Sequence, residues 1–309
     1  GNVGSEVAIE ASDIVIMKDN GVLDIDNEED FELMELIMKF EKYHGLGNDF
    51  IIFQEKDLID ITDYQELAKK VCHRKFGIGA DGMIVVAKSD KAPVFMKFYN
   101  ADGSIAPMCG NGIRCFTHYI VNNQLVTDKT FKVDTLAGVL EVTWDNNEQF
   151  MVRVYMGEPN FQPKSVPVVS DKKEFVSEKI ETSFGTYEIS SLFMGTTHTV
   201  TFSDNLIKEN IEGVGKEIEN NPIFPVKTNV NFVEIKTRAE VDVNTWERGA
   251  GFTYACGTGC CASVVMAKRF GYVDNKVKVN VPGGHMYIEL EGDSVYMIGP
   301  SEKICFGEY

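Results

Sequence analysis

A four-residue motif that occurs twice constrains this chain more than any other feature of its sequence. Cys109-Gly-Asn-Gly112 recurs as Cys256-Gly-Thr-Gly259. Each copy is followed by mainly apolar residues at the spacing of one helix face; these are Ile113, Phe116, Thr117 and Ile120 after the first copy, and Ala262, Val265 and Met266 after the second. The repeat predicts two related lobes, each with a cysteine at the N-terminus of a helix.

Strand-like segments dominate the rest of the chain, whose 309 residues are enough for two domains with separate cores. Residues 62–65, beginning with Thr62, suit the capping box of a helix. Segments rich in β-branched and aromatic residues predict strands at 83–87, 94–99, 131–143, 151–155, 191–194, 231–236, 276–281, 285–290 and 294–298. This mixture predicts an α+β fold without regular βαβ alternation.

Residues 1–37 differ in composition from the rest of the chain. Their acidic stretch from Asp24 to Glu32 is typical of a linker. We interpret 1–37 as an appended leader without assigned function, ahead of a natural start at Met38. Residues 1–17 resemble a short segment of heavy-metal P-type ATPases, but the sequence shows neither the phosphorylated aspartate motif nor the membrane helices of a pump, so this resemblance implies no transport function.

Charge and composition exclude several classes of function. The net charge of −17 argues against a nucleic-acid or anionic-membrane surface, because phosphate contacts need clustered Lys and Arg. A small or partly cationic substrate fits better. The sequence lacks an apolar window long enough to cross a membrane and a secretory signal, which predicts a cytoplasmic protein. Its seven cysteines, an odd number, predict reduced thiols rather than a disulfide framework.

The paired cysteines suit a reaction that inverts an amino-acid α-carbon. Inversion needs a base on one face of the carbon and an acid on the other, and equivalent groups can exchange these roles. A helix N-terminus favours a thiolate by placing N–H groups and partial positive charge beside it. The glycines allow backbone N–H groups to approach a substrate carboxylate. Each motif thus predicts a base and half of an anion site.

Two other kinds of site, for zinc and for a dinucleotide, fit the sequence less well. A zinc site could pool Cys109, Cys115, Cys256, Cys260 and Cys261, but only Cys256 and Cys260 approximate the paired spacing of zinc ligands. We interpret Cys72, Cys115, Cys260, Cys261 and Cys305 as packing residues. Gly77-Ile-Gly-Ala-Asp-Gly82 matches the dinucleotide fingerprint in letters, yet it follows a helix and precedes a strand, so we interpret it as a loop and exclude NAD.

Five segments together resemble the diaminopimelate epimerase family over roughly residues 38–309. They are 38–50, 99–104, 109–114, 246–251 and 255–259. The resemblance implies two pseudo-symmetric lobes, each a curved, mostly antiparallel sheet around a central helix, with the site in the cleft and no pyridoxal phosphate or metal. We expect 38–154 with 302–309 to form the N-terminal lobe and 155–301 the C-terminal lobe. The partner would be a small amino-acid substrate, and the chain a possible homodimer.

The resemblance also implies roles for individual residues. Cys109 and Cys256 would be the acid/base pair, and His198 and Glu247 would assist proton transfer or hold the substrate amine. Residues expected to bind the reacting carboxylate are Gly110, Asn111, Gly257 and Thr258. Residues expected at the distal end of the substrate are Asn48, Asn100, Thr196, Asn229 and Arg248, where an Arg fork suits a second carboxylate. Without the resemblance, His198 reads as a hydrogen-bonded strand-end residue, Glu247 and Arg248 as a surface ion pair, and the asparagines as turn residues.

Two departures from the family pattern put the substrate in question. The family commonly has Gly-Asn-Pro-His where this chain has Gly195-Thr-Thr-His198, and Gly-Ala-Gly-Glu-Thr where it has Gly249-Ala-Gly-Phe-Thr253. These changes favour, as an alternative to diaminopimelate, a histidine-like or lanthionine-like amino acid, because unpaired polar groups penalise poorly matched substrates. An alternative of another class is a non-catalytic metal-binding or regulatory module with inert thiols.

Overall fold

The computed structural model describes residues 37–59 and 61–309. Residues 1–36, which hold the segment similar to P-type ATPases and all but the last residue of the predicted leader, lie outside the described residues. None of the helices in the described part of the chain is long and apolar enough to cross a membrane.

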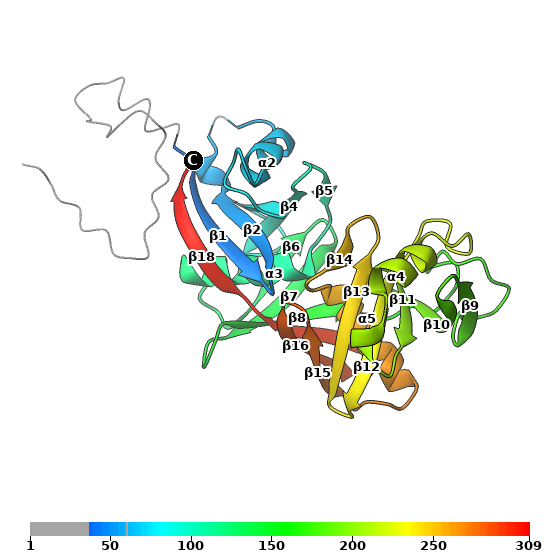
Figure 1. Cartoon of the computed structure of the whole chain (residues 1–309). Helices are drawn as coiled ribbons and strands as arrows, with labels where there is room; N and C mark the ends of the chain where they lie inside the picture. Colours follow the sequence, from blue (N-terminus) through cyan, green and yellow to red (C-terminus); the bar gives the residue numbers. More distant parts are fainter. Residues whose placement is uncertain (1–36, 60) are drawn as a thin grey trace, which may run out of the picture.

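The first half of the described chain surrounds one central helix, α3 (Figure 1). Its elements are β1 (Lys39–Gly45), β2 (Asn48–Gln54), η1 (Glu55–Asp57), α2 (Tyr64–Cys72), β3 (Gly82–Ala87), β4 (Val94–Asn100), β5 (Ile105–Ala106), α3 (Gly110–Asn122), β6 (Thr130–Thr135), β7 (Gly138–Asp145) and β8 (Met151–Gly157).

The second half repeats this order around α5. Its elements are β9 (Glu178–Thr182), β10 (Gly185–Met194), β11 (Thr196–Phe202), η2 (Leu206–Lys208), α4 (Ile211–Glu219), β12 (Asn229–Thr237), β13 (Glu240–Glu247), β14 (Gly251–Thr253), α5 (Gly257–Arg269), β15 (Lys276–Val281), β16 (Gly284–Glu291), β17 (Ser294–Pro300) and β18 (Glu302–Glu308).

Strand pairing shows the duplication directly. In the first half, β2 pairs in parallel with β3 and β4 with β6. In the second half, β11 pairs in parallel with β12 and β13 with β15. The hairpins β1–β2, β3–β4 and β6–β7 likewise match β10–β11, β12–β13 and β15–β16, all antiparallel. These pairings confirm the predicted α+β fold with two pseudo-symmetric lobes.

The lobes are joined through the last two strands of the second half, β17 and β18. The last strand, β18, pairs with β1, whereas β8 pairs with β17. Figure 1 shows β18 running from the second lobe back alongside β1. Because of these pairings, all the strands belong to one continuous mixed sheet.

Hydrophobic burial explains why α3 and α5 lie at the centre. Both helices carry almost wholly buried sequences, and one large cluster of apolar side chains packs around them. The helices α2 and α4 are amphipathic instead, and each covers a smaller cluster on the outside of its lobe. The central helices are therefore held on all sides, which fixes the position of their N-termini.

The predicted elements match the structure with two differences. The helix predicted to be capped by Thr62 begins at Tyr64, because Asp63 is the N-cap and accepts from two backbone N–H groups. The segment predicted as one strand at 131–143 is a hairpin, β6 and β7, that turns at Leu136 and Ala137. The segment interpreted as a loop at 77–82 is a loop up to Asp81, and Gly82 begins β3. The cysteines interpreted as packing residues are buried, apart from the half-buried Cys305.

Candidate active site

The N-termini of α3 and α5 meet at the centre of the molecule. A Cβ placed on Gly257 would lie 4.0 Å from the Cα of Gly110 and 2.8 Å from the Sδ of Met297. Glycine at 257 allows this approach without displacing Met297, whose side chain a Cβ there would push aside. The repeated motif thus brings the two cysteine-bearing turns together, as the sequence predicted.

Cys109 is the half-buried N-cap of α3. Its Sγ accepts from the backbone N–H of Gly112 at 3.4 Å and lies 3.9 Å from Asn48 Oδ1. Burial raises the pKa of this thiol, while the N–H groups of Gly112 and Asn111 and the charge of Arg114 act to lower it. The N–H groups and the charge of Arg114 therefore offset part of the rise in pKa that burial causes at Cys109.

Cys256 is the N-cap of α5, but its environment differs from that of Cys109. It is 6% exposed, its Sγ lies 3.6 Å from Thr258 Oγ1, and it makes no side-chain cap bond. Burial, followed by the nearby carboxylate of Glu247, raises the pKa of Cys256 well above its ordinary value. The two thiols thus occupy equivalent positions in the fold, but the charges and hydrogen bonds around them differ.

Glu247 lies at the end of β13, beside Cys256. Its Oε1 accepts a hydrogen bond from Thr253 Oγ1 at 2.6 Å. Burial raises the pKa of Glu247, although the hydrogen bonds from Thr253 and Cys256 counteract it. A partly desolvated carboxylate in contact with a thiol can take a proton from it.

His198 is fully buried on β11. Its Nδ1 lies 3.2 Å from Asn231 Nδ2, whose orientation is set because the same amide donates to Thr199 O and its Oδ1 accepts from Thr245. Nδ1 is therefore the acceptor, and the neutral ring carries its proton on Nε2. Burial, with the charge of Arg248, lowers the pKa of His198 to about 3.

The Nε2–H group of His198 has no protein acceptor among the described residues. Buried polar groups are usually paired, so an unpaired donor beside reactive groups is a place for a substrate acceptor. Asn111 repeats this pattern. Its Nδ2 donates to Asn48 Oδ1 and Ala255 O, both at 3.1 Å, while its buried Oδ1 has no partner within the described chain.

The first turns of α3 and α5 supply the other donors. A helix leaves its first N–H groups without intrahelical partners. At these two helices those groups belong to Gly110 and Asn111 and to Gly257 and Thr258. The two sets converge, so the four residues predicted to bind a carboxylate are brought together.

The residues predicted at the distal end of the substrate form a less uniform group. Asn229 holds the chain, since it donates to Thr197 O at 3.0 Å and accepts from the N–H of Arg248 at 2.8 Å. The exposed Arg248 donates to Val226 O and has no ion pair with the described residues. Asn100 donates to Ser104 within its own turn, so within the described chain no hydrogen bond joins it to either thiol.

The two departures from the family pattern lie on different faces. Thr196 and His198 share one face of β11, since strand residues two apart point the same way. Phe252 instead points away from the site, because its neighbour Thr253 turns its hydroxyl to Glu247. Phe252 is 49% exposed. Of the two changes, only the one at Thr196 is placed to affect a bound substrate.

The sequence did not single out Asn231 or Asp81. Asn231 orients His198 and is fully buried; its signal was an asparagine between two apolar residues, Val230 and Phe232. Asp81, in the 77–82 loop, accepts from Asn48 Nδ2 at 2.7 Å and from Arg74. This ion-paired loop therefore orients the Asn48 amide towards Cys109.

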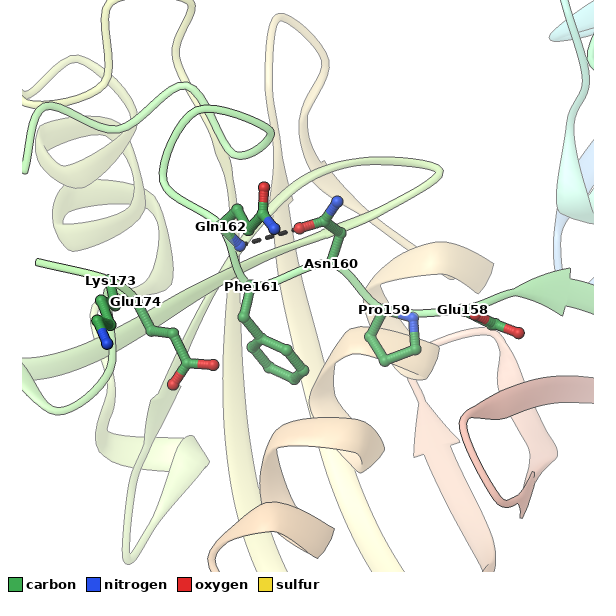
Figure 2. Close-up of a pocket in the computed structure, with 7 residues that line it drawn as sticks. All are labelled: Glu158, Pro159, Asn160, Phe161, Gln162, Lys173 and Glu174. Atoms are coloured by element: carbon green, nitrogen blue, oxygen red, sulfur yellow. Dashed lines mark hydrogen bonds between the residues drawn. The ribbon is translucent and has the colours of Figure 1, made fainter.

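A separate surface pocket of about 700 Å³ lies beside the other end of α5 (Figure 2). Arg269, the last residue of α5, pairs with Glu174 and stacks over Phe161, which both line this pocket. Arg269 lies about 20 Å from Cys256 along the helix axis, whereas Asn160 pairs with Phe193, which faces Thr197 on β11. The lining residues are Glu158, Pro159, Asn160, Phe161, Gln162, Lys173 and Glu174.

Comparison with known proteins agrees with this geometry. The model of the family described as diaminopimelate epimerase matches residues 40–162 and 190–304. The chain is 44% identical over 276 residues to the diaminopimelate epimerase of Alkaliphilus metalliredigens, covering 88% of this chain and 97% of the relative. It is 44% identical over 274 residues to that of Clostridium perfringens, covering 88% and 99%. These matches give no support to the likeness of residues 1–17 to P-type ATPases.

Solved structures share the fold at low sequence identity. A phenazine biosynthesis protein of the PhzF family from Bacillus anthracis has a TM-score of 0.65 at 15% identity, covering 88% of this chain and 99% of that one. A hydroxyproline epimerase from Agrobacterium vitis has a TM-score of 0.65 at 14% identity, covering 88% and 91%. With the repeated cysteine turns and the extent of the sequence match, this chain belongs to the diaminopimelate epimerase family.

Proposed function

We propose that this protein interconverts LL- and meso-diaminopimelate by inverting one α-carbon, a step towards lysine and cell-wall precursors. One observation carries the proposal: two helix N-termini, each capped by a cysteine, face each other with Gly110 and Gly257 in close approach. The substrate α-carbon would lie between Cys109 and Cys256, with its carboxylate on the converging N–H groups.

Each turnover moves one proton off the substrate and one onto it. A thiolate on one side removes the α-proton and becomes a thiol, and the electron pair is delocalised into the substrate carboxylate. The thiol on the other side then donates its proton to the opposite face and becomes a thiolate. The roles of Cys109 and Cys256 are exchanged at the end, which suits a reversible reaction. No step of this scheme needs a cofactor.

The unequal surroundings of the thiols suggest separate tasks for His198 and Glu247. Neutral His198 offers an N–H donor, which suits a carboxylate oxygen rather than an ammonium group. Glu247 offers an acceptor, so it would hold the substrate ammonium and take the proton of Cys256 when that thiol acts as the base. We assign the distal carboxylate to Arg248, with Asn48, Asn100, Thr196 and Asn229 around it.

Deuterium incorporation in heavy water tests the reaction. LL- and meso-diaminopimelate should each exchange their α-proton and interconvert, whereas histidine, lanthionine and glutamate should exchange much more slowly. Exchange with none of these amino acids would refute an epimerase. Faster exchange with histidine or lanthionine would replace diaminopimelate by that substrate while leaving the inversion chemistry intact.

Two substitutions separate the departures from the family pattern. Thr196→Asn restores an amide on the face shared with His198 and should lower KM for diaminopimelate. Phe252→Glu restores the other family residue on the opposite face and should leave KM unchanged, so it is the matched control. A change in KM for Phe252→Glu alone would contradict the assignment of faces.

We also propose the lobe boundaries predicted from the sequence, 38–154 with 302–309 and 155–301, together with a cytoplasmic homodimer. Light scattering on the purified chain tests the assembly. A mass close to the 34.5 kDa of one chain would contradict the dimer.

A further inference from the structure

Arg114 follows the first cysteine motif by two residues, but the proposed chemistry gives it no role. It lies one turn into α3 and is the largest fully buried side chain in the described structure. Within residues 37–59 and 61–309, no carboxylate forms an ion pair with it. A buried cation without a counter-ion is costly, so its presence in the centre of the molecule needs a reason.

Its contacts join the first turn of α3 to the end of β17. Nε donates to Pro300 O and Nη1 to Gly110 O, both at 3.1 Å, and Nη1 lies 3.4 Å from Met297 Sδ. Nη2 has no partner among the described residues. The guanidinium is therefore anchored by carbonyl oxygens, which orient a charge without neutralising it.

Two glycines beside the guanidinium make room for it. A Cβ at Gly45 would lie 2.9 Å from Nη2, and a Cβ at Gly299 would lie 2.9 Å from Nε. Gly45 immediately precedes the turn that carries Asn48, and Gly299 lies on β17. Two strands from different lobes thus approach the guanidinium closely at glycines.

The ionisable groups that act on the charge of Arg114 are thiols. Burial lowers the pKa of Arg114, and the groups that act against this are Cys115, Cys109, Cys260 and Cys261. An arginine nevertheless stays protonated at neutral pH. At Cys109 its field opposes that of Glu247, which is the other charged group acting on this thiol.

We propose that Arg114 is a positioning residue of the inversion reaction: it holds a fixed positive charge behind the first turn of α3, where it favours the Cys109 thiolate and the negative charge that develops on the substrate. This inference rests on the proposed function for its substrate. Preorganised charge in a site without water acts strongly on a developing anion and needs no rearrangement during the reaction.

A structural role and this electrostatic role predict opposite outcomes for stability. Arg114→Met keeps much of the length of the side chain and removes the unpaired charge. Replacing a buried charge by an apolar group of similar volume is often neutral or stabilising. If Arg114 serves the reaction, Arg114→Met should keep or raise Tm while kcat falls.

Alkylation of Cys109 by iodoacetamide, followed across pH by peptide mass spectrometry, measures the charge effect without any substrate. We expect Arg114→Met to slow alkylation about tenfold at neutral pH, equivalent to an upward shift of about one pH unit in the profile. The kcat for diaminopimelate should fall by at least about tenfold, with a smaller change in KM. Arg114→Lys keeps the charge and should keep the alkylation profile of the wild type.

The control is Thr117→Val, which removes a buried polar group from the same helix but no charge; Thr117 donates only to Ile113 O. It should leave the profile unchanged. An unchanged profile in folded Arg114→Met, or a shifted one in Arg114→Lys, would overturn the proposal. If the methionine variant does not fold, Arg114→Gln, which also removes the charge, takes its place. Failure of the wild type to exchange any amino acid would refute the function but leave the alkylation result standing.

Discussion

The substitution Gly259→Ala tests whether the close packing at the N-terminus of α5 positions Cys256. A Cβ at residue 259 would lie 2.3 Å from Asn231 Oδ1, about 1 Å short of the 3.4 Å at which ordinary contact begins, and 3.2 Å from both Cys256 Sγ and Thr245 Oγ1. Asn231 cannot turn aside freely, because it is bonded to Thr245, to Thr199 O and to the ring of His198. Either this network or the first turn of α5 must move.

The energetic cost of this overlap can be bounded. Overpacking a filled core costs about 1 to 3 kcal/mol, whereas alanine gains about 1 kcal/mol over glycine inside a helix. We therefore expect a net loss of about 0 to 2 kcal/mol in the free energy of unfolding. The effect on activity should be much larger, since a displacement of about 1 Å can lower a rate about 100-fold.

The control is the equivalent glycine of the other motif, Gly112. A Cβ there would lie 3.2 Å from Cys109 Cβ and from the flexible Cε end of Met96, so a shift of a few tenths of an ångström would accommodate it. Thermal unfolding and steady-state epimerisation should be measured for both variants. A Gly259→Ala enzyme with the kcat of Gly112→Ala would refute the link between this packing and the position of Cys256.

Other predictions concern the proton-transfer groups and the loop behind Arg248. Cys109→Ala or Cys256→Ala should abolish inversion but keep some deuterium exchange from the face of the remaining thiol; full inversion by either variant would contradict the two-base scheme. The pKa of His198 falls from 6.5 to about 3 on folding, so only the unfolded chain binds a proton there between these pH values. The free energy of unfolding, measured with urea, should therefore decrease as pH falls from 6.5 towards 3, by up to about 1.4 kcal/mol per pH unit. His198→Gln should show a shallower decrease. Glu219 accepts hydrogen bonds from Gly249 N and Trp246 Nε1, the residues on either side of Glu247 and Arg248. Glu219→Gln should therefore raise KM about tenfold with little change in kcat. An unchanged KM would show that these hydrogen bonds do not position Arg248.

The repeated motif allowed the core of the site to be predicted from the sequence. Cys-Gly-x-Gly followed by apolar residues at helical spacing predicts a turn that begins a helix, and two copies of the motif predict two such turns. The approach of Gly110 and Gly257 is a tertiary contact, but the glycines on both sides were its signal.

Features that depend on strand register could not be predicted in the same way. Phe252 departs from the family pattern, yet only the pairing of β13 with β14 shows that it points away from Glu247. Asn231 was hidden because an asparagine in a strand can belong to a turn, an edge or a buried network, and the sequence alone does not distinguish these. The cap of α2 shows a smaller limit, since Thr62 and Asp63 are both good N-caps and only the backbone conformation decides between them.

The pairing of β18 with β1 has a consequence for biosynthesis. Strand β1 is made among the first elements of the described chain, but β18, one of its two neighbours, is made last. The first lobe therefore cannot complete its sheet on the ribosome while the second lobe is still being synthesised, although domains often fold in the order of translation. Until β18 is made, β1 exposes an open edge that could pair with other chains. A chain cut between β17 and β18 would contain both cysteine turns but leave the sheet of the first lobe unfinished.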